Sequence, residues 1–175
     1  MSEDVRKILV PVDGSPHALK AAELASDLAV RHDAEIVLLH ALLSKEMPAG
    51  LKRALEIELG ERVPGYDNLV TIPVEMMARV GNRKDNPLSV RELGLVGQYV
   101  LSGVADKCLG RGVRKVEKRV EEGRAAEVIA DVAKAIDADM IVMGSRGLSD
   151  VKRLVFGSVS HEVAQADPCT LVIVQ

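Results

Sequence analysis

Apolar residues along the chain form two alternating patterns, short continuous runs and longer segments with helical spacing. The continuous runs cover 5–12, 36–39, 140–143 and 170–174, and such runs are typical of strands in a parallel sheet. A fifth strand is expected at 113–120, where apolar residues are mixed with charged ones, as at the edge of a sheet. We therefore expect five strands, distributed along the chain.

Between these strands, apolar residues recur at intervals of three and four residues, which predicts helices. Two long helices are expected at 16–31 and 87–109, and two shorter ones before the fourth and fifth strands. The first helix also carries a start signal, because Ser15 has the side chain of an N-cap and Pro16 suits the first helical position. Strands and helices thus alternate.

This alternation predicts an α/β fold, with a Rossmann-like open five-stranded parallel sheet in the order 3-2-1-4-5 and helices on both faces. Residues 44–86 fit no clear period, and Pro64-Gly65 is a turn signal within them. We expect one domain over 1–175, with a variable insert at about 44–86.

Composition narrows the classes of function. The net charge is −3 and no block of basic residues occurs, so we expect no nucleic-acid partner. We find no signal peptide and no long uninterrupted apolar run, and we expect a cytoplasmic protein without membrane insertion. Cys108 and Cys169 have neither metal-ligand nor redox spacing, so we interpret both as small apolar residues.

Three residues follow strand ends and should meet at one edge of the sheet. Asp13, Ala41 and Gly144 come directly after the first, second and fourth predicted strands. Ligands of open α/β sheets bind beyond the carboxyl ends of the strands, where the strand order reverses. We therefore expect a ligand crevice that joins the two ends of the chain.

The fourth strand leads into a glycine-rich loop, Gly144-Ser-Arg-Gly147, and Gly157-Ser158 precedes the last helix. Backbone N–H groups and the dipole of a helix N-terminus attract anions, and Arg146 adds positive charge nearby. Taken alone, the glycines could equally be turn residues and Ser158 a cap. The convergence with Asp13 favours a phosphate site.

With both ends considered together, the chain resembles the universal stress protein family. The matching stretches are Lys7-Ile-Leu-Val-Pro-Val-Asp-Gly-Ser15, His40-Ala41, Ile141-Val-Met-Gly-Ser-Arg-Gly147 and Gly157-Ser158. The last two form the signature G-x2-G-x9-G-S/T of the ATP-binding branch of that family. This signature differs from a P-loop, because no lysine follows its glycines at the position that cradles a phosphate.

The resemblance implies a nucleoside end for the crevice. Pro11 and Val12 would lie beside the adenine, and Ala41 would offer it backbone contacts. Asp13 would accept hydrogen bonds from the ribose or the base. His40, just before Ala41, is instead interpreted as a hydrogen-bonded structural residue rather than a catalyst.

The resemblance also implies a phosphate end. Met143 and Gly144 would line the ribose, and Arg146 would lie near the phosphates. The residues that would hold the phosphates, mainly through N–H and hydroxyl groups, are Gly147, Gly157, Ser158, Val159 and Ser160. The implied cofactors are ATP and a divalent cation such as Mg²⁺, which usually binds to the phosphates themselves; no metal-binding side chain is identified.

Two classes of function remain open. The favoured one is a nucleotide-dependent regulator of the stress response, because phosphoryl transfer needs a base or positioned water and none is apparent. The alternative is an ATP hydrolase or nucleotidyl-transfer enzyme of related architecture. A phosphorelay receiver domain is disfavoured, since it requires an acidic pair after the first strand and only Asp13 occurs there.

The last strand predicts how the chain assembles. Thr170-Leu-Val-Ile-Val174 is apolar, yet the expected strand order puts it at an edge of the sheet. An uncovered apolar edge invites pairing with another strand. We expect a homodimer through 170–174, as the resemblance also implies, and an unidentified regulatory protein as a further partner.

Overall fold

The computed structural model describes residues 5–42, 90–146, 157–166 and 168–175. Strands and helices alternate along these residues, as the sequence predicts. The strands are β1 (Lys7–Pro11), β2 (Glu35–Leu42), β3 (Val116–Glu122), β4 (Met140–Gly144) and β5 (Thr170–Val174). The helices are α1 (Pro16–His32), α4 (Val90–Gly110), α5 (Ala125–Ala135) and α6 (Ser158–Ala166). The predicted insert at 44–86 lies outside the described residues.

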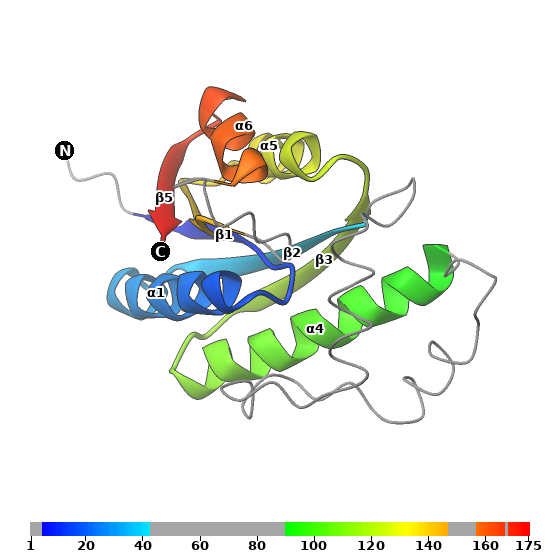
Figure 1. Ribbon diagram of the computed structural model, residues 1–175. Coiled ribbons are helices and arrows are strands. Elements are labelled where there is room, and N and C mark those ends of the chain that lie inside the picture. The colour runs from blue at the N-terminus through cyan, green and yellow to red at the C-terminus, as the bar shows by residue number, and fades with distance from the viewer. Residues whose placement is uncertain (1–4, 43–89, 147–156, 167) are drawn as a thin grey trace.

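The five strands form one sheet in the order β3-β2-β1-β4-β5, and each neighbouring pair is parallel. This confirms the predicted strand order. Figure 1 shows α1 and α4 on one side of the sheet and α5 and α6 on the other. The helices that follow these two neighbouring strands, α1 after β1 and α6 after β4, therefore lie on opposite faces of the sheet.

Two apolar layers hold the helices on the sheet. On the α1 and α4 side, five buried alanines of α1 let the helix approach the strands closely: Ala18, Ala21, Ala22, Ala25 and Ala29. On the other side, Ile129 and Val132 of α5 and Val163 of α6 pack against Leu9 and Ile141. Full burial of one isoleucine, leucine or valine side chain stabilises the fold by about 1.5–3 kcal/mol.

The start of α1 confirms a signal read from the sequence. Ser15 lies just before the helix in an extended conformation, and its hydroxyl accepts a hydrogen bond from the Ala18 N–H at 3.2 Å. Pro16 occupies the first helical position, where its missing N–H costs no hydrogen bond.

The third strand begins later than predicted, at Val116 rather than Val113. Gly112 has a φ of +100°, and the Val113 N–H donates to the Cys108 carbonyl at 3.2 Å. Val113 therefore belongs to the turn that ends α4, a left-handed cap that satisfies the last carbonyls of the helix. Among the described residues, no helix is long and apolar enough to span a membrane.

Candidate functional site

The loop between β1 and α1 forms the first wall of the candidate site. The Asp13 carboxylate accepts a hydrogen bond from the Ser15 N–H at 2.9 Å, which folds the loop back on itself. Gly14, between them, has a φ of +87°, a backbone conformation that side chains disfavour. Ser15 is buried, and its hydroxyl lies 3.4 Å from the Arg146 carbonyl at the end of β4. The loop thus connects the end of β1 with the segment after β4.

The neighbouring strand β2 holds this loop from the other side. The Val12 N–H donates to the Leu39 carbonyl at 2.8 Å, and the Val12 carbonyl lies 2.7 Å from Nδ1 of His40. His40 is therefore a hydrogen-bonded structural residue, as expected from the sequence. Ala41, the next residue, is half-buried at the carboxyl end of β2.

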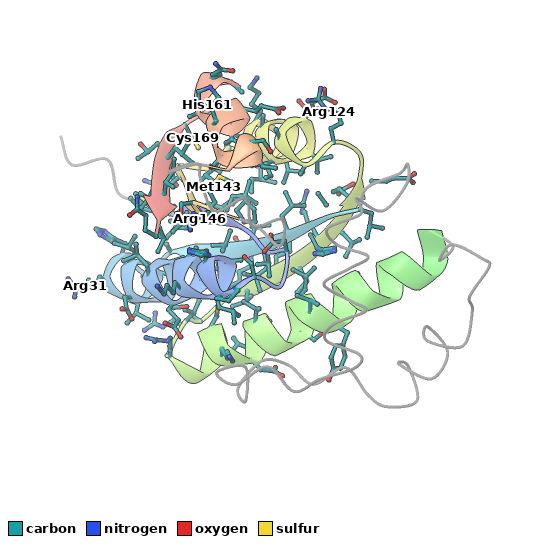
Figure 2. The ribbon with its side chains drawn as sticks, viewed as in Figure 1. Arg31, Arg124, Met143, Arg146, His161 and Cys169 are labelled. Atoms are coloured by element: carbon teal, nitrogen blue, oxygen red, sulfur yellow. The ribbon has the colours of Figure 1, made fainter. Side chains whose placement is uncertain are left out.

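The end of β4 packs directly against the start of α1. A β-carbon built on Gly144 would lie 2.8 Å from the backbone carbon of His17, so only glycine allows this approach. The side chain of Met143 is buried in the layer under α5 and α6, whereas Arg146 is half-buried beyond the strand end. In the view of Figure 2, the labelled side chains Met143 and Arg146 lie between α6 and α1.

The N-terminus of α6 forms the second wall. The Gly157 N–H donates to the Ser145 carbonyl at 2.6 Å, which attaches the helix start to the end of β4. A β-carbon on Gly157 would lie 3.0 Å from that same carbonyl oxygen, a tight contact that glycine avoids. The buried Ser160 hydroxyl donates to the Gly157 carbonyl at 3.0 Å, while Ser158 is exposed.

The first turn of α6 offers hydrogen-bond donors. The N–H groups at the start of any helix lack an acceptor within that helix. In α6 these are the N–H groups of Ser158, Val159 and Ser160, and they carry the partial positive charge of the helix dipole. This helix start suits an anion, whereas the Asp13 carboxylate in the loop before α1 suits hydroxyl or amine donors.

The structure brings most of the predicted site residues to one edge of the sheet, but it gives them different roles in packing. Gly144 and Gly157 make close backbone contacts, Met143 contributes its side chain to the core, and the Ser160 hydroxyl bonds backbone carbonyls. Gly147 lies outside the described residues. Among the residues that the structure describes, no group of three or more acidic, histidine or cysteine side chains could hold a metal ion.

Sequence analysis missed the connecting role of Ser145. Its N–H donates to the Val174 carbonyl at 2.7 Å, and its carbonyl accepts from Gly157. Ser145 therefore links β4, β5 and the start of α6 through its backbone. Since backbone groups carry no sequence signal, the only hint was its place between the glycines of the loop.

Fold and site together define the class of this protein. It is a doubly wound parallel α/β protein whose candidate site lies at the carboxyl ends of β1 and β4, where the strand order reverses, the usual ligand position of such folds. Residues 4–175 match the Universal stress protein family. The chain therefore belongs to that family.

Individual relatives agree with this assignment. Universal stress protein YxiE of Bacillus subtilis (strain 168) is 29% identical over 169 residues, covering 97% of this chain and 98% of YxiE. The universal stress protein of Archaeoglobus fulgidus, in complex with dAMP, has a TM-score of 0.61 at 17% identity and covers 98% of this chain and 99% of its own. A family protein of Arabidopsis thaliana with AMP bound has a TM-score of 0.56 at 20% identity, with coverages of 97% and 90%. The two structures share the fold of this chain.

Proposed function

We propose that this protein binds an adenine nucleotide, with ATP as its ligand, at the edge of the sheet between Asp13 and the start of α6. The observation that carries the proposal is that the Asp13 loop and the start of α6 both contact the segment after β4. The loop does so through Ser15 and Arg146, and the helix start through Gly157 and Ser145. The nucleotides bound by the Archaeoglobus and Arabidopsis proteins of the same fold support an adenine ligand.

The proposed orientation follows from the chemistry of the two walls. The Asp13 carboxylate accepts hydrogen bonds from the ribose or the base, and Pro11, Val12 and Ala41 lie on the same side at the ends of β1 and β2. The phosphates lie at the other wall, where the first turn of α6 supplies N–H donors and a positive dipole. Arg146, between the walls, adds positive charge.

A divalent cation completes the proposed ligand. Mg²⁺ is commonly held by substrate phosphates, one or two carboxylates and water. We place the cation on the phosphate oxygens, where Mg²⁺ usually binds in nucleotide sites.

The proposed role is regulatory, and a nucleotide-loaded dimer in the cytoplasm is the proposed active form. The walls supply N–H donors and one carboxylate at the nucleoside end, which suits binding better than phosphoryl transfer. We therefore expect slow ATP hydrolysis at most, and the nucleotide state would be read by a protein partner. The dimer would form through the apolar edge strand β5, whose side chains from Leu171 to Val174 are half-buried.

Calorimetric titration with ATP tests this proposal through two variants of Ser158. This residue is exposed at the first position of α6, where proline is well tolerated in helices. Ser158→Ala removes the hydroxyl alone, and Ser158→Pro also removes the backbone N–H. A hydrogen bond to a charged group is worth about 1.5–3 kcal/mol, so Ser158→Pro should bind ATP roughly 10- to 160-fold more weakly than Ser158→Ala.

The pair is preferable to Gly157→Val, because a β-carbon at Gly157 presses on the Ser145 carbonyl and would disturb the loop itself. AMP serves as the internal control. It places fewer phosphate oxygens at α6, so its affinities for the two variants should differ less than those of ATP. Equal affinity of both variants for ATP would remove α6 from the phosphate site. Wild-type protein that binds no adenine nucleotide would overturn the proposal as a whole.

A further inference from the structure

We propose that His40 is a positioning residue for nucleotide binding, which fixes the Val12–Asp13 peptide and so holds the Asp13 carboxylate at the nucleoside end. The inference rests on the proposed function and names His40 as a residue that sets the affinity for the nucleotide. His40 acts through its contact with the Val12 carbonyl, and no contact with the nucleotide is required.

The hydrogen bond itself has a defined direction. Nδ1 of His40 lies 2.7 Å from the Val12 carbonyl oxygen. A carbonyl can only accept a hydrogen bond, so Nδ1 must carry the proton and donate. The Val12 N–H is held as well, by the Leu39 carbonyl at 2.8 Å. Two successive residues of β2 thus hold both polar backbone groups of Val12.

This arrangement orients the next residue, Asp13. The Val12 carbonyl belongs to the rigid peptide group that joins Val12 to Asp13, so holding the carbonyl fixes the plane from which Asp13 projects. The Asp13 carboxylate is then held from the other side by the Ser15 N–H at 2.9 Å. The donor of His40 and the Ser15 N–H thus act on the same loop.

Helix α4 holds the imidazole ring in this position. A β-carbon built on Gly97 would lie 2.7 Å from Cδ2 of His40 and 3.3 Å from its Cγ, which is closer than side chains pack. Gly97 is buried within the helix, where glycine costs about 1 kcal/mol relative to alanine. The ring therefore lies between α4 and the Val12 carbonyl, and a methyl group at Gly97 would displace it.

Two variants of equal size separate the hydrogen bond from the packing. His40→Asn retains an N–H close to the place of Nδ1, whereas His40→Leu puts a methyl group there; both lose the outer part of the ring. A hydrogen bond of this kind contributes to the fold, and its loss can weaken binding by at most about 2- to 13-fold, when all of it is needed to hold the loop in the binding conformation. In calorimetric titrations, we expect the Leu variant to bind more weakly than the Asn variant, within this range and by the same factor for adenosine and for ATP.

A double-mutant cycle shows whether His40 acts through Asp13. In an Asp13→Ala background the orientation of the loop no longer matters, so the Leu and Asn variants should bind ATP equally. A merely structural role for His40 would leave the factor unchanged in that background, and this result would overturn the inference. Inorganic triphosphate, which has no nucleoside end, should bind both His40 variants alike.

Gly97→Ala supplies an independent arm if the His40 variants fold poorly. Alanine favours the helix, so the melting temperature should not fall through loss of helix propensity, yet the added methyl displaces the ring and should weaken ATP binding. Unchanged ATP affinity in Gly97→Ala, with wild-type protein binding normally, would refute the positioning role. If wild-type protein itself binds no adenine nucleotide, the proposed function fails and the inference falls with it.

Discussion

The two edge strands of the sheet, β3 and β5, occupy equivalent positions, but the side chains of β3 are mostly charged and those of β5 are mostly apolar. Strand β3 reads Val-Glu-Lys-Arg-Val-Glu-Glu, whereas β5 reads Thr-Leu-Val-Ile-Val. On β3, Arg119 pairs with Glu117 along the strand at 2.5 Å and Lys118 reaches the Ser102 hydroxyl at 3.0 Å. Charges of this kind prevent edge pairing, whereas a plain apolar edge promotes it. The difference indicates that only one edge is suited to a partner strand.

The backbone shows which groups a partner could reach. Ser145 donates to the Val174 carbonyl, so Val174 directs its polar groups at β4, and alternation directs those of Leu171 and Ile173 to the open edge. On β3, the Lys115 carbonyl accepts from β2, so by the same alternation Lys118 directs its N–H outward. Each edge therefore offers a position where proline removes an outward N–H and no bond within the sheet.

The largest expected effect comes from Ile173→Pro. In a two-fold symmetric dimer each change occurs twice, so two hydrogen bonds of about 1 kcal/mol each are lost, or roughly 30-fold in affinity. We expect a dimer in the wild type and a monomer in the variant by light scattering at micromolar concentration. Lys118→Pro is the matched control on β3 and should leave the dimer intact.

Two results would reverse the comparison of the edges. If Lys118→Pro dissociated the protein and Ile173→Pro did not, β3 would be the pairing edge despite its charges. If the wild type were already a monomer, neither edge would pair, and the proposed dimer would be wrong.

A smaller effect is expected from removing the charges of β3. Replacing Glu117, Arg119 and Glu121 together by valine makes β3 mostly apolar, so that the sheet has a second apolar edge. A protomer with two such edges can pair at both, so assembly no longer stops at two chains. Light scattering should then detect species larger than the dimer. A variant that remained a strict dimer would mean that the charges do not protect this edge.

The smallest expected effect concerns Lys115, just before β3. Its ammonium donates to the Glu35 carboxylate at 2.8 Å, and this hydrogen bond raises the pKa of Lys115 above its ordinary value of 10.5. A raised pKa stabilises the fold at pH values below the ordinary one, and this contribution is lost as the pH rises through the folded-state value. The Lys115 side chain is 71% exposed, so water and salt screen the pair.

Glu35→Gln should therefore return the pKa of Lys115 towards 10.5, as followed by NMR titration of its side chain. The melting temperature at neutral pH should change little. A large loss of stability would show that this ion pair attaches the charged edge to the sheet more firmly than its exposure suggests.

The order of elements and the topology could be predicted because each depends on local signals. Continuous apolar runs predicted four of the strands, and Ser15 with Pro16 predicted the start of α1. The start of β3 was wrong by three residues, since Val113 is as apolar as a strand residue but is used by the cap of α4. A local pattern cannot tell which of two neighbouring elements takes an apolar residue.

The site was predictable only in its positions along the edge of the sheet. The sequence indicated that His40 is structural, but its acceptor, the Val12 carbonyl, is 28 residues away and has no signature. Likewise the contact of Gly97 with the imidazole has no local signal, because it depends on how α4 lies on β2. The predicted ligand roles of Asp13, Gly157 and Ser158 remain proposals.

The close contact at Gly144 has a consequence for the thermodynamics of binding. The spacing between the start of α1 and the end of β4 is set by backbone atoms in contact, and no side-chain rotamer contributes to it. The loop before α1 and the end of β4 therefore keep their relative position in the folded protein without a ligand. The proposed nucleotide would then lose little affinity to ordering these two segments, because that ordering already accompanies folding.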